Sequence, residues 1–68
     1  MLTEAKVITV RRIGDFYEAE DGAAQALHNA CGCCITHRPG HVLAGFPYLY
    51  LRQYMERAES NGFVIAVA

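Results

Sequence analysis

An excess of positive charge is missing from this sequence. Six Lys and Arg residues stand against seven Asp and Glu residues, so the formal net charge at pH 7 is -1. A protein of this charge has no long-range field that attracts a phosphate backbone. We therefore expect any binding to nucleic acid to be local or assisted.

Long apolar runs are missing as well. Lys6, Arg11 and Arg12 interrupt the apolar residues near the N-terminus, and no stretch approaches the roughly 20 apolar residues that cross a membrane. The N-terminus also lacks the pattern of a signal peptide. These absences indicate a soluble, cytoplasmic protein that makes no contact with a membrane.

A disulfide framework is not expected. The chain has three cysteines, an odd number, and Cys33 and Cys34 are sequence neighbours that could not easily bridge each other. This pattern favours a reducing compartment over secretion.

The common signatures of catalysis are missing too. The chain has no GxxxxGKS/T loop to cradle a nucleoside triphosphate. Glu18, Glu20 and Asp21 could be pictured as the metal site of a nuclease, but acidic residues gather at a helix N-terminus for electrostatic reasons alone. On a strand, Cys34 and His37 would lie on opposite faces and could not act as nucleophile and base. We expect no enzymatic activity and no cofactor.

Apolar residues are abundant instead, at 53% of the 68 residues. A chain of this length buries only about 60% of the surface that its unfolded form exposes, so it forms one small domain with a thin core. The surplus of apolar surface predicts contact with another protein. We expect residues 1–68 to be a single domain that forms a homo-oligomer or binds a protein partner.

The first half of the sequence predicts a hairpin followed by a helix. Segment 5–13, rich in β-branched residues, and segment 16–20 are typical of two strands joined by a Gly-Asp turn. A helix follows, with Asp21 as its N-cap and Gly32 as its stop. Helical spacing predicts its apolar face to consist of Ala19, Ala23, Ala26, Leu27 and Ala30.

The second half predicts another hairpin, another helix and a last strand. Residues 33–38 and 41–46 are typical of strands, and a Pro-Gly turn separates them. Pro47 opens a helix that ends at Asn61. Residues 63–68 are continuously apolar, as expected of a strand covered on both faces. The buried stripe of the second helix consists of Leu51, Tyr54, Met55 and Ala58.

The predicted order is therefore β-β-α-β-β-α-β. This order defines a small α/β domain in which two helices pack on one mixed sheet. The last strand follows a helix directly, so we expect it to pair in parallel through a crossover connection.

Every cysteine and histidine of the chain lies between residues 28 and 41, and this composition suits zinc. A closed zinc site joins two pairs of ligands that are well separated in the chain, whereas all candidates here lie in one segment. The alternative is that Cys33 and Cys34 are small apolar packers in a buried strand. We assign no metal site and keep a metal-binding module as a third hypothesis. The candidates are His28, Cys31, Cys33, Cys34, His37 and His41.

The segment RRIGDFYEAED has two aromatic residues and a glutamate next to a hairpin turn. Phe16 and Tyr17 alternate across a strand, so they point to opposite faces. An exposed ring at this position is either an oligomer contact or a platform on which a base stacks. The alternation alone leaves open which of the two points inward.

Four segments carry a combined motif: RRIGDFYEAEDGA, ITHRPG, LAGFPY and YMERAESNGFVIAVA. In this order they resemble the N-terminal, mismatch-recognition domain of the bacterial MutS family. The corresponding family pattern is Gly-Asp-Phe-Tyr-Glu, Leu-Thr-Lys-Arg-Gly, Met-Ala-Gly-Ile-Pro-Tyr and a helix followed by Gly-x-x-Val-Ala. The resemblance runs from Val7 to the last residue and implies the same small α/β fold.

The resemblance also implies a site. In the family, the Phe of a Phe-x-Glu pair enters the minor groove and stacks on a mispaired or unpaired base, and the Glu hydrogen-bonds that base while the DNA kinks. By position these residues are Phe16 and Glu18, with Phe16 pointing outward and Tyr17 inward. Wedging a ring into a base step costs on the order of a few kcal/mol, and least where pairing is already defective.

Some positions depart from the family. The chain is slightly shorter after Phe-Tyr-Glu, and Leu49 stands where the family usually has His. Compared with the family, the chain lacks the first helix, the Cys-Glu-Gln segment and the later strand. It also lacks the connector, lever, clamp and ATPase domains, so we expect a truncated, stand-alone module without ATP-driven repair. His37 stands where the family has a Lys.

Two hypotheses follow besides the metal-binding module. The first is a DNA-binding module that contacts mismatched or bent duplex DNA through Phe16 and Glu18. The second is a non-catalytic protein that keeps the fold and uses its sheet edge and apolar surplus for self-association or partner binding. Candidate phosphate contacts for the first hypothesis are Arg11, Arg12, Arg38 and His37.

Overall fold

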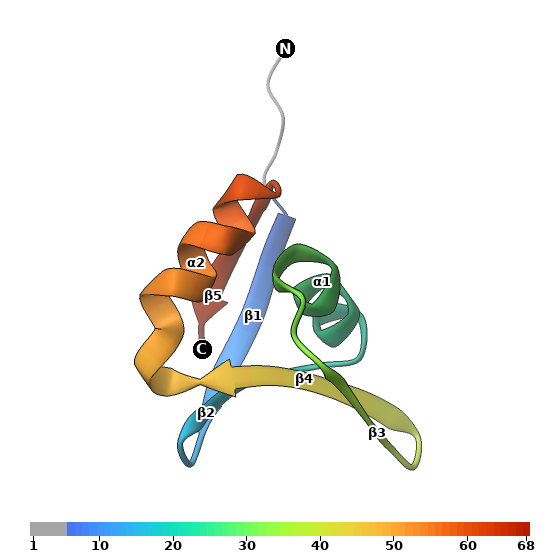
Figure 1. Ribbon diagram of the computed structural model, residues 1–68. Coiled ribbons are helices and arrows are strands. Elements are labelled where there is room, and N and C mark those ends of the chain that lie inside the picture. Colours follow the sequence, from blue (N-terminus) through green and yellow to red (C-terminus); the bar gives the residue numbers. More distant parts are fainter. Residues whose placement is uncertain (1–5) are drawn as a thin grey trace.

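The computed structural model describes residues 6–68, and over this range it confirms the predicted order of strands and helices (Figure 1). A short 3-10 helix, η1, precedes the second α-helix. Ala5, the first residue of the predicted first strand, lies outside the described residues. The elements are β1 (Lys6–Ile13), β2 (Phe16–Glu20), α1 (Asp21–Cys31), β3 (Ile35–Arg38), β4 (His41–Pro47), η1 (Tyr48–Tyr50), α2 (Leu51–Ser60) and β5 (Phe63–Val67).

Five strands form one mixed sheet within residues 6–68, in the order β3-β4-β2-β1-β5. The pairs β3–β4, β4–β2 and β2–β1 are antiparallel, and β1 pairs with β5 in parallel. The parallel pair requires a crossover, which α2 supplies. The predicted α/β class and the predicted parallel pairing of the last strand are confirmed.

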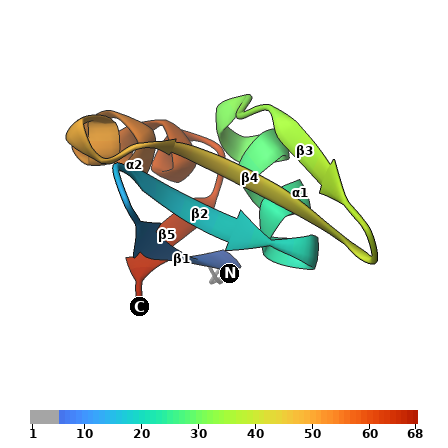
Figure 2. The same cartoon turned by 90° about the horizontal axis from the view of Figure 1, so that it is seen from below.

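Both helices pack on one face of the sheet, which we call the inner face. Along β1, Ile8 and Val10 are buried on this face, while Val7 and Thr9 are exposed on the other, as the two-residue period of a strand requires. α1 packs on β4 and β2, and α2 packs on β5. Figure 2 shows the two helices on the same side of the twisted sheet. We call the opposite, uncovered face the open face.

The core lies between the inner face and the helices. Phe46 of β4 is the largest of its fully buried side chains. The Phe46 ring stacks on Tyr54 of α2 with the ring centroids 4.4 Å apart, and lies 5.8 Å from the ring of Tyr17 on β2. These three rings join two strands to a helix, and such aromatic pairs add about 0.5–1.5 kcal/mol each beyond the area they bury.

Side chains from the end of α2 cap the last turn of α1. Asn61 Nδ2 donates a hydrogen bond to the Ala30 carbonyl at 2.8 Å, and Arg57 Nη1 donates to the Cys31 carbonyl at 3.2 Å. The last carbonyls of a helix have no partner within the helix, so these bonds tie the two helices together. Gly32, with φ 74° in the left-handed region, ends α1 as predicted.

The start of α1 differs from the prediction. Ala19 belongs to β2 and is buried on the inner face. Asp21 is the first helical residue, with φ 52°, and Glu20 occupies the N-cap position without a side-chain capping bond. Asp21 Oδ1 instead accepts a hydrogen bond from the Val42 N–H of β4 at 3.2 Å, so a tertiary contact has replaced the predicted cap. The buried face of α1 consists of Ala24, Leu27, Ala30 and Cys31.

The segment between α1 and β3 corrects a second prediction. β3 begins at Ile35, so Cys33 and Cys34 lie in a connection and not in a strand. Cys33 is buried and Cys34 is exposed. Of these two residues, only Cys33 packs in the core as predicted. The His28 Nδ1 lies 2.7 Å from the Cys33 carbonyl and donates a hydrogen bond to it. This bond ties the connection to α1 and explains why it does not extend the strand.

Two predictions about the second half are also corrected. Pro47 ends β4, and α2 begins only at Leu51, after η1. β5 is an edge strand whose side chains on the open face are uncovered, so Val64 is exposed. The prediction of coverage on both faces is wrong because both helices lie on the inner face. The predicted stripe of α2 does pack on the core, through Leu51, Tyr54, Met55 and Ala58.

Neither of the two α-helices found in residues 6–68 has the length and apolar character needed to cross a membrane.

Candidate functional site

Phe16 lies at the tip of the β1–β2 hairpin, on the open face. Its side chain is 47% exposed, and its cross-strand partner Ile13 is exposed as well. Tyr17 points to the inner face, where its ring lies against Phe46. The predicted orientation, with Phe16 outward and Tyr17 inward, is confirmed.

The hairpin tip is held from the inner side. The Nε–H of Arg12 donates to the Gly14 carbonyl at 2.6 Å, and the Arg12 guanidinium lies 3.8 Å from the centroid of the Tyr48 ring. The Tyr48 N–H donates to the Asp15 carbonyl at 2.9 Å. A hydrogen bond from a charged group and a cation–π contact both stabilise this arrangement. Phe16 is therefore carried by a turn that is bonded to η1.

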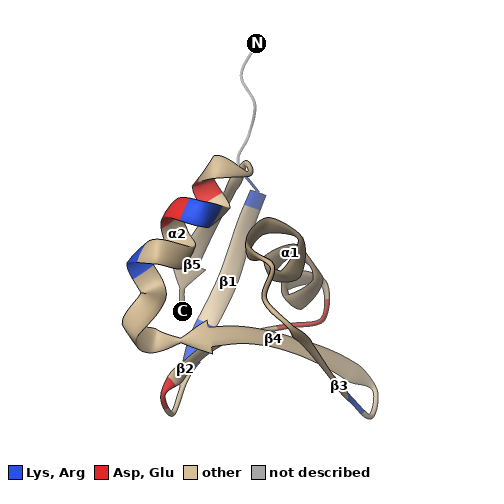
Figure 3. Ribbon diagram, viewed as in Figure 1, with Lys and Arg blue, Asp and Glu red and all other residues tan. Residues whose placement is uncertain are grey.

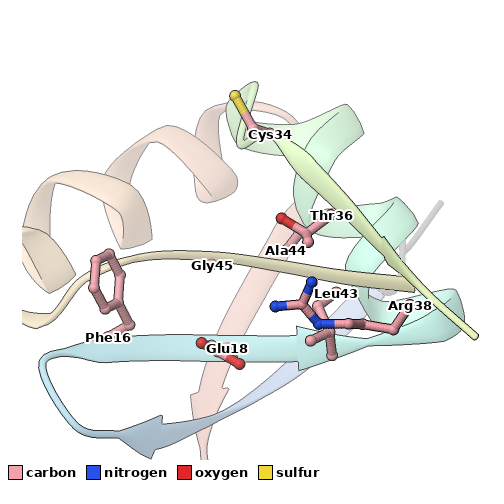
Figure 4. A pocket seen from close by; sticks show the side chains of 8 residues that line it. All are labelled: Phe16, Glu18, Cys34, Thr36, Arg38, Leu43, Ala44 and Gly45. Carbon is pink, nitrogen blue, oxygen red and sulfur yellow. The ribbon is translucent and has the colours of Figure 1, made fainter. Parts of the chain in front are cut away.

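The open face has a hollow of about 250 Å³ beside Phe16 (Figure 4). The hollow lies over β4, between β2 and β3, and Figure 4 shows Glu18 and Arg38 directed toward it from these two flanking strands. It therefore combines an aromatic ring, a hydrogen-bond acceptor and a cation on one surface. The other lining residues are Cys34, Thr36, Leu43, Ala44 and Gly45.

Gly45 makes room for Glu18. The two residues are cross-strand partners on β4 and β2. A Cβ at position 45 would lie 2.6 Å from the Tyr17 carbonyl oxygen and 3.1 Å from Glu18 Cγ. A glycine inside a strand often marks such a close approach. Our sequence reasoning missed Gly45 as part of the site, although the glycine in LAGFPY was the available signal.

Arg11 lies on the other side of Glu18. It is the cross-strand partner of Glu18 on β1, and both residues line a second hollow of about 240 Å³. Directly opposite residues of an antiparallel pair have Cβ atoms about 5 Å apart. The Glu18 carboxylate is thus flanked by two cationic residues, Arg11 on β1 and Arg38 on β3.

Arg12 and His37 are not part of this arrangement. Arg12 points to the inner side, next to Tyr48, and His37 shares the face of its partner Val42, which packs against the core. The strand alternation that brings Arg11 and Arg38 to the open face takes their neighbours away from it. Charged residues of both signs are spread along the described helices and strands (Figure 3). The predicted residues gathered on the open face are Phe16, Glu18, Arg11 and Arg38.

The cysteines and histidines do not converge. Within residues 6–68, no group of three or more His, Cys, Asp or Glu side chains is arranged to hold a metal ion. Burial raises the pKa of Cys33 to about 11; the nearby Cys31 adds to this shift and Arg57 opposes it. Burial raises the pKa of Cys31 too, against the effect of Arg57. Both thiols therefore resist forming the thiolate that a metal ligand requires.

A scan against models of protein families finds no match to this chain, but curated proteins include relatives. Over 57 residues the chain is 39% identical to the DNA mismatch repair protein MutS of Chlamydia muridarum; the match covers 84% of this chain and 7% of that protein. It is 33% identical over 60 residues to MutS of Pseudothermotoga lettingae, covering 88% of this chain and 7% of that protein. Over 60 residues it is 32% identical to MutS of Thermotoga maritima, covering 88% of this chain and 8% of that protein.

The fold and the site define a class of protein: a small α/β domain whose hairpin presents an exposed Phe and a Glu on one open face. The relatives show that the chain is similar to MutS proteins over most of its own length. The chain is a MutS-like domain, and the resemblance that its sequence motifs indicated is confirmed. It spans 7 to 8% of the length of the curated relatives named above.

Proposed function

We propose that this chain binds duplex DNA at mismatched, unpaired or easily bent steps, through the open face of its sheet. Its curated relatives are DNA mismatch repair proteins by name. The observation that carries the proposal is Phe16, an aromatic ring that is 47% exposed at the tip of a braced hairpin. Residues 1–68 act as one domain in this proposal.

Phe16 is suited to act as a wedge. Stacking of an aromatic ring on a base contributes about 1–3 kcal/mol to the binding free energy. Inserting it between base steps costs on the order of a few kcal/mol of unstacking, and less where a base is mispaired or unpaired. The ring therefore selects DNA by its deformability and not by the identity of base edges.

Glu18 is suited to meet the base that Phe16 touches. It is two residues along the same strand, so the two side chains leave the same face at Cα positions about 7 Å apart. The space over Gly45 lets its carboxylate reach the hollow. A carboxylate repels the DNA backbone, so its presence here is useful only where it accepts a hydrogen bond from a base N–H.

Arg11 and Arg38 are suited to contact phosphates on either side of Glu18. Phosphate contacts set the register of a protein on DNA and carry no sequence information. With a net charge of -1, the chain gains little from counterion release beyond these local contacts, so we expect weak binding with a shallow salt dependence. In this proposal Arg12 positions the hairpin through its contacts with Gly14 and Tyr48, and His37 has no assigned contact.

The proposal is tested by fluorescence anisotropy on the 68-residue chain at low salt. One labelled duplex carries a single unpaired base and the other is fully paired. We expect tighter binding to the first, and Phe16→Ala to weaken that binding about tenfold or more and remove the preference, since stacking contributes about 1–3 kcal/mol.

Leu49→Ala is the matched control. Leu49 lies on η1, outside the hollow, and is 73% exposed, so its truncation removes a similar apolar area and should leave the preference intact. Equal binding of the wild type to both duplexes, or wild-type behaviour of Phe16→Ala, contradicts the proposal.

A further inference from the structure

The two edges of the sheet differ in a way that points to a protein partner. At one edge, β3 has four residues, and Thr36, His37 and Arg38 are all exposed. Charged residues and a short strand discourage an edge from pairing with another chain. At the other edge, β5 (Phe63–Val67) consists of five apolar residues without a charge.

Among residues 6–68, no strand pairs with the outer side of β5, so its outward backbone groups are available. In the parallel β1–β5 ladder, the Lys6 N–H donates to the Gly62 carbonyl at 3.2 Å and the Ala68 N–H donates to the Val10 carbonyl at 2.8 Å. Backbone groups of a strand point alternately to its two sides, and even-numbered residues of this segment point toward β1. The outward N–H and C=O groups are therefore those of Phe63, Ile65 and Val67.

Apolar side chains surround this edge. Val64 is 39% exposed and Val67 is 46% exposed, and Val7, the cross-strand partner of Val64 on the open face, is 63% exposed. On the open face, Val64 and Val7 make the surface beside this edge apolar. On the inner face, the Lys6 Nζ lies 5.9 Å from the centroid of the Phe63 ring. An edge of this kind adds a strand from another chain at little desolvation cost.

We propose that β5 pairs antiparallel with β5 of a second copy of this chain, across a two-fold axis at Ile65. The outward residues are symmetric about Ile65, so Phe63 of one copy lies opposite Val67 of the other, and Ile65 lies opposite itself. Each such pair exchanges both of its backbone hydrogen bonds. A two-fold axis places identical residues of the two copies near one another. The uncharged strand β5 tolerates this, whereas pairing β3 in the same way would bring two copies of Arg38 together and cause repulsion.

The dimer has one geometric consequence. Directly opposite residues of an antiparallel pair project to the same side of the sheet, so the open faces of the two copies form one continuous surface. Both hairpins that carry Phe16 then lie on that surface. The pairing itself does not depend on DNA binding, and it can be tested separately.

Sedimentation equilibrium of the 68-residue chain, from low micromolar to millimolar concentration, tests the proposal. We expect the mass to rise from 7.5 kDa toward twice that value. Val64→Lys places a charge beside the edge, and Val67→Pro removes an outward N–H without removing a bond to β1. Each should weaken the dimer about tenfold or more, a change of about 1.4 kcal/mol.

Thr36→Lys is the matched control, because it adds the same charge at the opposite edge and should leave the mass unchanged. Circular dichroism checks that every variant is folded. Amide hydrogen exchange supplies a readout that needs no substitution: the Phe63 and Ile65 amides should gain protection with concentration, while the Val64 and Ala66 amides are protected throughout. A monomer at all concentrations, a dimer that survives both variants, or outward amides that gain no protection overturns the proposal.

Discussion

Phe16 and Tyr17 are neighbours on β2 with similar rings and opposite environments. Tyr17 packs on Phe46 of the inner face, whereas Phe16 is 47% exposed on the open face. Full burial of a Phe side chain stabilises a domain by about 1.5–3 kcal/mol relative to exposure. The chain forgoes part of this stabilisation at Phe16, so this ring remains free for the stacking proposed above.

The comparison extends to the two faces as a whole. The inner face carries the described core, from Ile8 on β1 to Ile65 on β5. The open face carries Phe16 and Glu18 with an arginine on either side, beside the hollow over β4. Folding depends on the first face and binding is proposed for the second, so substitutions on the two faces should have separable effects.

Phe46→Ala should have the largest effect. Removing this buried ring takes away its stacking on Tyr54 and leaves a cavity, so we expect the free energy of unfolding to fall by about 3–5 kcal/mol. Urea denaturation followed by circular dichroism measures this. Phe16→Ala, on the open face, should cost less than about 1 kcal/mol. Similar losses of unfolding free energy in the two variants would contradict the difference between the two faces.

Gly45→Ala should have the next largest effect. The new Cβ meets the Tyr17 carbonyl at 2.6 Å, and backbone must shift to relieve this contact, which costs about 1–3 kcal/mol. We also expect a loss of duplex preference, because Glu18 is displaced. Gly22→Ala is the control: its Cβ meets nothing within 4 Å and should stabilise α1 by up to about 1 kcal/mol. Equal stability of both variants contradicts the close approach at Gly45.

Arg12→Met separates a positioning role from a phosphate contact. Loss of the bond to Gly14 and the stack on Tyr48 should cost about 1–2 kcal/mol of stability. The preference for the defective duplex should fall while the salt dependence stays as in the wild type. Arg38→Gln should do the opposite, lowering the salt slope by about 1 with little change in preference. A lower slope for Arg12→Met would reassign Arg12 to the phosphate contacts.

The smallest effect concerns Cys33 and alkaline pH. Burial raises the pKa of Cys33 from 9.0 to about 11, so between these values the unfolded chain loses a proton that the folded chain keeps. The stability that this thiol contributes is complete below pH 9 and is lost as the pH rises toward 11. Urea midpoints of the wild type and Cys33→Ala, measured across this range, should converge as the pH rises. A constant difference between them contradicts this assignment.

Much of the fold could be predicted from the sequence, because its elements have clear periods and clear stops. The β1–β2 hairpin, the glycine that ends α1 and the stripe of α2 depend on local spacing and backbone preference, and the structure agrees with all three. The site could be predicted in part: the family resemblance implied Phe16 and Glu18, and strand alternation places both on one face. Local spacing failed at Asp21, which bonds to the distant strand β4, and at residues 33 and 34, where His28 bonds to the Cys33 carbonyl. It also failed at Pro47, which ends β4, and at β5, whose open face no helix of residues 6–68 covers.

The sequence by itself determined the order of the elements and which side chains share a face, because periods of two and of 3.6 are properties of the backbone. Only the tertiary structure decided which face the helices cover, and therefore that Phe16 points to water and Tyr17 to the core. It also decided that Arg11 and Arg38 flank Glu18 while Arg12 and His37 do not. The physical reason is that periodicity relates neighbours along one strand, whereas burial depends on how separate elements pack.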